Sequence, residues 1–147
     1  MSAQWADALT AALHDAGDHL GEALIERFED GSLNVGVPIG ESPWIVWLSP
    51  WESWLVAMCP ARWGHGLERR DFARAMHANR APSLWRWAAH DNYLCLRAEL
   101  PLEVGDPIAF RTLVIQLFSD LRAIVGRFAL GEQPDIGRPR DPTEEGR

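Results

Sequence analysis

Histidine is the side chain that changes charge nearest neutral pH, so it is the first candidate for a general base. The chain has five histidines, and two of them lie in suggestive places. His65 stands between two glycines in a predicted loop, where exposure would suit proton transfer, and His90 precedes Asp91 in a predicted turn. Catalysis by either one would need a nucleophile or carboxylate that only folding could bring near. The ordinary interpretation, loop and turn histidines without a catalytic role, is therefore favoured.

The spacing of potential metal ligands argues against a metal site. No two histidines stand four residues apart around a carboxylate, and no closely spaced cysteine pair occurs. Cys59 and Cys95 instead lie in apolar, strand-like runs, which predicts buried and reduced thiols. A disulfide between them is the less favoured alternative, and it requires their strands to be neighbours.

Motifs of the common enzyme classes are missing from the sequence. The chain contains no P-loop, no Gly-x-Ser-x-Gly and no Gly-x-Gly-x-x-Gly. All 14 basic residues are arginine, which removes every role that needs a lysine. We therefore expect no enzymatic activity, no cofactor and no metal.

The charge balance limits the possible partners. The formal net charge is -7 and the isoelectric point is near 5.1, so the chain repels phosphate backbones and anionic lipids. We expect neither nucleic acid nor membrane as a partner. One predicted helix carries four arginines that could receive an anion, but a solvated helix face is the favoured interpretation; they are Arg69, Arg70, Arg74 and Arg80.

Two features of the sequence bear on its location. No run of 18 or more apolar residues occurs, so no segment is expected to span a membrane. The first residues lack a basic segment followed by an apolar one, which is the pattern of a secretory signal. We expect a cytoplasmic protein.

The eight tryptophans are the most unusual feature of the composition. Four of them fall within eleven positions, at Trp44, Trp47, Trp51 and Trp54, and two more follow at 85 and 87. Tryptophan is the residue most enriched in binding hot spots, and a large exposed apolar patch usually marks an interaction site. These residues therefore either fill a core or form a surface that another molecule covers, and we expect a mixture of the two.

Hydrophobic periodicity predicts the elements that carry these residues. In order, they are a helix from residue 2 to 16 or to 28, strands 33–38, 44–49 and 53–59, a helix 67–79, strands 84–90 and 92–100, and a helix 106–128. Residues 21–28 could also be a strand, and both alternatives stay open. The order is that of an α+β single domain, helix–three strands–helix–two strands–helix, with an antiparallel sheet and helices packed on one face.

Strand alternation assigns the side chains to two faces of the sheet. In the first hairpin, which is predicted to turn at residues 49–52, Trp44, Val46 and Leu48 share one face. Trp54, Val56 and Met58 share a face of the next strand, opposed by Leu55, Ala57 and Cys59. In the last strand Leu94, Leu96 and Ala98 face one way, and Tyr93, Cys95 and Arg97 the other. Trp85 and Trp87 point to one side, and on the helix 67–79 the residues expected to face inward are Leu67, Phe72 and Met76.

The domain is expected to span residues 1–130. Residues 131–147 are rich in proline, glycine and charge and contain a single apolar residue. This composition is typical of a disordered tail.

The second half of the chain resembles the type III secretion chaperone-like fold, which includes the CesT-type effector chaperones and the YbjN-like proteins. The resemblance depends on Asn79 at a helix end, the hairpin at Asp91-Asn92, Leu100-Pro101-Leu102, and the long helix from Asp106. The helix and strands before them fit the first half of that fold. The resemblance implies a small acidic homodimer that binds a protein segment, a secreted effector or another client, and does no chemistry. The Trp hairpin would then present either the dimer interface or the effector groove.

These observations lead to two functional hypotheses. The first is a dimeric, chaperone- or adaptor-like protein-binding module whose contacts come from Trp44, Trp47, Trp51, Trp54, Trp85 and Trp87, with Phe72 and Met76 of the helix 67–79 helping to form the dimer. The second is a small-molecule binding protein in which the tryptophans line an aromatic pocket.

Overall fold

The computed structural model describes residues 4–15, 24–39, 42–63, 68–90, 93–101 and 107–128. In chain order the elements are α1 (Gln4–Asp15), β1 (Leu24–Arg27), β2 (Leu33–Ile39), β3 (Ser42–Trp51), β4 (Trp54–Trp63), α3 (Arg69–Ala78), β5 (Arg86–His90), β6 (Tyr93–Pro101) and α4 (Pro107–Phe128). The predicted tail at 131–147 and the boundary at residue 130 lie outside the described residues.

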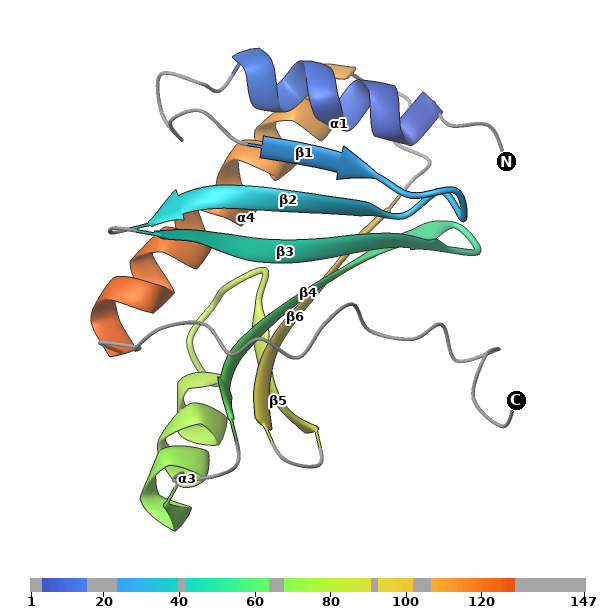
Figure 1. Cartoon of the computed structure of the whole chain (residues 1–147). Coiled ribbons are helices and arrows are strands. Elements are labelled where there is room, and N and C mark those ends of the chain that lie inside the picture. Colours follow the sequence, from blue (N-terminus) through green and yellow to red (C-terminus); the bar gives the residue numbers. More distant parts are fainter. Residues whose placement is uncertain are drawn as a thin grey trace.

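The six strands form one antiparallel sheet in the order β1-β2-β3-β4-β6-β5 (Figure 1). Consecutive strands are neighbours except where α3 intervenes, since β6 rather than β5 pairs with β4. This arrangement confirms the predicted α+β class and the antiparallel sheet. It also makes β3 and β4, the two ten-residue strands of the Trp hairpin, the centre of the sheet.

The first half of the chain holds one strand more than the pattern predicted. Helix α1 ends at Asp15, and the described chain resumes as β1, which pairs with β2 in the register Ile25↔Val35. Of the two alternatives for residues 21–28, the strand is therefore the one that forms over 24–27. Arg27 fixes β1 to α1, because its Nη2 donates to Asp7 Oδ1 at 2.8 Å.

Two turns between strands contain residues with positive φ, Gly31 and Glu52. Gly31 has φ 89°, a conformation that costs an L-residue free energy, and Asp30 Oδ1 accepts bonds from the Ser32 N–H (3.0 Å) and hydroxyl (2.6 Å). The second turn was predicted at residues 49–52 and this was wrong: β3 runs on to Trp51, and the turn consists of Glu52 and Ser53. Glu52 takes φ 54° there, because a two-residue hairpin needs positive φ.

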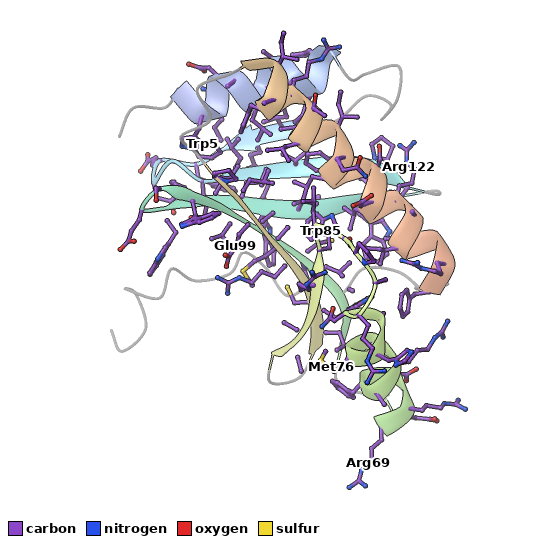
Figure 2. The ribbon with its side chains drawn as sticks, turned by 180° about the vertical axis from the view of Figure 1, so that it is seen from behind. Trp5, Arg69, Met76, Trp85, Glu99 and Arg122 are labelled. Atoms are coloured by element: carbon purple, nitrogen blue, oxygen red, sulfur yellow. The ribbon has the colours of Figure 1, made fainter. Side chains whose placement is uncertain are left out.

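Helices α1 and α4 cover one face of the sheet, which we call the inner face; the opposite side is the outer face (Figure 2). The core lies between them and is built from alternate residues of every long strand. Its fully buried members include Leu33, Val35, Leu48, Leu55, Leu96, Leu100, Leu117, Phe118 and Leu121. The predicted faces of β3, β4 and β6 are confirmed, since each inward set is buried in this core.

Helix α3 lies beside β5 at the end of the sheet (Figure 1). The Asn79 amide connects the two: its Nδ2 donates to Trp87 O at 2.9 Å, and its Oδ1 accepts from Trp87 N at 2.7 Å. One side chain thus replaces the backbone of a further strand at this edge. The residue predicted to end the helix is also its anchor.

The orientation of α3 differs from the prediction. Ala75 is its buried residue and Phe72 is half-buried, whereas Met76 is 41% exposed. The helix packs mainly against β5, and Arg74 also lies over the Phe128 ring of α4; the small Ala75 permits the close approach of the helix. Met76 is therefore a surface residue, and Leu67 lies outside the described residues.

Candidate protein-binding surface

The outer face is not covered by any helix among the described residues. Its central strip consists of the outward side chains of β3 and β4, which contain no charged residue over Pro43–Trp51 and Trp54–Pro60. The members of this apolar strip are Pro43, Ile45, Trp47, Ser49, Trp51, Trp54, Val56, Met58 and Pro60. A sheet with two hydrophobic faces and helices on only one of them leaves the second face for another molecule.

Trp51 and Trp54 are the most exposed part of the apolar strip. They pair directly across the hairpin, and their side chains are 48% and 46% exposed. Side chains directly opposite each other in an antiparallel pair have Cβ atoms about 5 Å apart, so the two indoles form one aromatic surface at the hairpin end. Half of each indole stays in water, which leaves apolar area for a partner to bury.

Trp47 occupies the middle of the apolar strip. It is 9% exposed, yet it lies outside the core cluster beneath α1 and α4, as does the buried Cys95 two strands away. Alternation explains this, because Trp47 faces away from its neighbours Val46 and Leu48. Trp47 therefore belongs to the outer face but offers a partner little exposed area.

The remaining predicted contact tryptophans are core residues. Trp44, Trp85 and Trp87 all belong to the cluster on the inner face. Trp85 is 2% exposed and its indole N–H donates to Leu117 O of α4 at 2.7 Å, while Trp87 packs on Phe128 with ring centroids 5.1 Å apart. All three side chains are buried in the protomer, Trp85 and Trp87 against α4, so they offer a partner little exposed area.

Charged side chains flank the apolar strip in an ordered way. A single row of paired residues crosses all six strands. In the spatial order β1-β2-β3-β4-β6-β5 its members are Glu26, Asn34, Trp47, Met58, Arg97 and Arg86. The row is acidic at one edge of the sheet, apolar in the centre and basic at the other edge. Arg97 also pairs with Glu99 of its own strand at 3.1 Å.

Sequence reasoning did not propose Glu26 or Arg86 as contact residues. Each is an ordinary exposed charge when taken alone. Only the strand order places them at opposite ends of one row, and no local pattern encodes that order.

The two cysteines, Cys59 and Cys95, are unreactive near neutral pH. Their strands, β4 and β6, are neighbours, but Cys59 points to the inner face and Cys95 to the outer face, so the disulfide alternative is wrong and neither thiol is part of a disulfide. Burial raises the pKa of Cys59 well above its usual range and that of Cys95 to about 11. The thiolate is the reactive form, so neither residue is a nucleophile near neutral pH.

The histidines do not assemble into a site within the described chain. His14 and His77 are exposed on α1 and α3, His90 lies on β5, and His65 is outside the described residues. Among the residues that the structure describes, no three His, Cys, Asp or Glu side chains are grouped so that they could hold a metal ion. Nor is any helix in this part of the chain long and apolar enough to cross a membrane.

The chain is similar to known proteins at the level of solved structures. No family model matches the chain, and no curated protein matches it. Among solved structures, the chain is similar to the Yersinia pestis type III secretion chaperone SycH, crystallised in complex with a stable fragment of YscM2. The identity is 25%, the TM-score is 0.49, and the match covers 84% of this chain and 99% of the other. A TM-score of 0.49 does not assign the chain to a family, so its function is inferred from its own surface.

Proposed function

We propose that this chain is a non-enzymatic protein-binding module, a dimeric chaperone- or adaptor-like protein that binds protein through the outer face of its sheet. The observation that carries the proposal is the apolar strip, which ends in two half-exposed tryptophans and has no described helix over it. Its partner is a protein segment, a secreted effector or another client, or a second copy of the chain. We place this activity in the cytoplasm.

The shape of the surface favours a protein over a small apolar molecule. A small-ligand site encloses most of its ligand between apolar walls. Here the most exposed tryptophans, Trp51 and Trp54, lie on the face of a sheet, while Trp44, Trp85 and Trp87 are buried in the core. An extended or flat protein surface can cover such a strip without a cavity.

Helix α3 offers a second, smaller contact region. Met76 is exposed there, Phe72 is half-buried, and Arg69 projects from the end of the helix (Figure 2). We propose that this helix contributes to dimer formation, as the sequence resemblance implies. The region is secondary because it offers much less apolar area than the outer face.

The proposal is tested by removing the exposed tryptophans and following both association and folding. A tagged chain and its Trp51→Ser/Trp54→Ser double variant are used to capture proteins from a lysate of the source cells, and their oligomeric states are measured by light scattering. We expect the variant to lose specific capture, self-association or both, with its melting temperature changed by only a few degrees.

Ile108→Ser is the matched control for this experiment. Ile108 is 74% exposed at the start of α4, so the change also removes an exposed apolar group, but from another surface. It should alter neither capture nor self-association. A double variant that retains every association of the parent chain would refute the proposed function.

A further inference from the structure

The charged row across the outer face has a symmetry that bears on what covers it. Counted from one edge of the sheet, its six positions hold Glu26, Asn34, Trp47, Met58, Arg97 and Arg86. Reversing the order exchanges the acidic end with the basic end and exchanges the two apolar central positions with each other. A surface with this property is complementary to its own rotated copy.

We propose that the partner on the outer face is a second copy of this chain, packed face to face about a twofold axis that runs along the strands between β3 and β4. This inference rests on the proposed function and specifies the partner of the same surface. The axis places β1 of one protomer over β5 of the other, so Glu26 faces the partner copy's Arg86 and the reverse contact forms as well. Trp47 then meets Met58 of the other copy, at the centre of the interface.

The same twofold rotation also brings the exposed tryptophans of the two copies together. Trp51 and Trp54 lie on the two strands nearest the axis, β3 and β4, and are paired directly with each other. Rotation therefore brings Trp51 of one copy over Trp54 of the other, and four indoles gather at one end of the interface. Aligned sheet packing places two such faces about 10 Å apart, a distance that large side chains fill.

The basic edge has an electrostatic reason to prefer an acidic partner. Arg86 and Arg97 stand directly opposite each other on β5 and β6, and like charges in that relation destabilise a sheet. Glu99 balances Arg97, while the bonds that Arg86 Nη1 makes within the described chain go to backbone carbonyls, of which Ser83 O lies at 3.0 Å. A carboxylate from outside the protomer would balance the remaining charge.

The charges also select one axis over the other possible one. A twofold axis across the strands through the same row would place each strand over its own copy. Glu26 would then face Glu26, and Arg86 would face Arg86. Such like-charge contacts suppress association, so only the axis along the strands is compatible with the row.

The available area suits a stable dimer. Strands of four to ten residues give the outer face a projected area on the order of 700 Å², from a spacing of about 4.8 Å and a rise of about 3.3 Å per residue. A standard interface buries about 800 Å² per partner. The projected area of the outer face is therefore close to that size.

The test exchanges the charges at the two ends of the row in the full chain. Glu26→Arg places arginine against Arg86, and Arg86→Glu places glutamate against Glu26, so each variant repels itself. We expect the parent chain to be dimeric in sedimentation velocity, and each variant to raise the dissociation constant at least ~10-fold. An equimolar mixture of the two variants should restore dimers, because both cross-contacts in the mixed dimer pair arginine with glutamate.

Three controls support this experiment. Glu29→Arg and Arg111→Glu make the same charge changes at exposed positions off the outer face, in the turn after β1 and on α4, and should leave the parent dimer intact. The effect of Glu26→Arg should shrink in high salt, which screens repulsion between surface charges. Because Arg86 also holds backbone carbonyls, the melting temperature of each variant is measured, and Glu26→Arg alone carries the test if Arg86→Glu does not fold.

The outcomes separate this inference from the proposed function. A monomeric parent chain, or a dimer insensitive to Glu26→Arg, overturns the second copy as the partner. If that chain still captures a protein in a manner that requires Trp51 and Trp54, the proposed function stands with a client on the outer face. If neither dimer formation nor capture depends on those tryptophans, both are wrong.

Discussion

The two faces of the sheet use the same residue type for opposite purposes. On the inner side, Trp85 is almost fully buried and its indole N–H bonds to the backbone of α4. On the outer side, Trp51 leaves about half of its surface in water and stands opposite Trp54, another half-exposed tryptophan, across the hairpin. Tryptophan composition alone therefore does not reveal function. The surface that covers each ring, or fails to cover it, distinguishes a core residue from a contact residue.

This comparison predicts its largest effect at Trp85. Replacing it with alanine removes a buried ring from between the sheet and α4, and should lower the free energy of unfolding by about 3–5 kcal/mol. Urea denaturation followed by circular dichroism measures the change. A loss below about 1 kcal/mol would mean that α4 does not hold this ring as the structure shows.

A smaller effect is expected from pH, through the buried thiol of Cys95. Its pKa is about 11 in the folded protein and near 8.5 when unfolded, so the unfolded chain releases this proton first. The contribution of the thiol to stability is complete below pH 8.5 and is lost as the pH rises toward 11, by on the order of 2–3 kcal/mol. Urea denaturation at pH 8 and pH 11 measures the loss. Cys95→Ala should show a smaller loss than the parent chain, and equal losses would contradict the prediction.

The next largest effect on stability is expected at the hydrogen bonds between Asn79 and the Trp87 backbone, which connect α3 to β5. Asn79→Ala removes both bonds to the Trp87 backbone and leaves a donor and an acceptor without this partner, at a cost of about 1–3 kcal/mol. Asn79→Asp keeps the acceptor for the Trp87 N–H and should cost less. Hydrogen exchange at Trp87 provides a local measurement, since the amide should exchange faster in the alanine variant than in the aspartate variant. Equal exchange in both would show that the bond is not maintained.

The smallest effect on folding is expected at the outer hairpin. Trp51→Ser or Trp54→Ser removes one partner of an exposed cross-strand pair, a contact worth about 0.2–1 kcal/mol. Each change should therefore leave the free energy of unfolding almost unaltered, in contrast to Trp85→Ala. Parallel urea titrations of the three variants measure the difference. If the outer variants unfold as readily as the inner one, the two faces are not distinct.

The sequence alone determined the local features of this protein. Alternation assigned Trp44 and Trp47 to opposite faces and did the same for Leu55 and Val56, because neighbouring side chains of a strand point to opposite sides. Asn79 marked a helix end, since that signal depends on a few adjacent residues. The segment at 24–27 was ambiguous because four residues are too few to show a period.

Only the tertiary structure decided which face became the core. The pattern gave two apolar faces in the Trp hairpin, and the packing of α1 and α4 chose the side of Trp44 over that of Trp47. It likewise turned α3 so that Ala75 packs and Met76 does not. The row from Glu26 to Arg86 also appears only in the folded chain, because strand order and register join residues far apart in sequence. Local periodicity shows which side chains share a face, but only long-range packing determines what lies against that face.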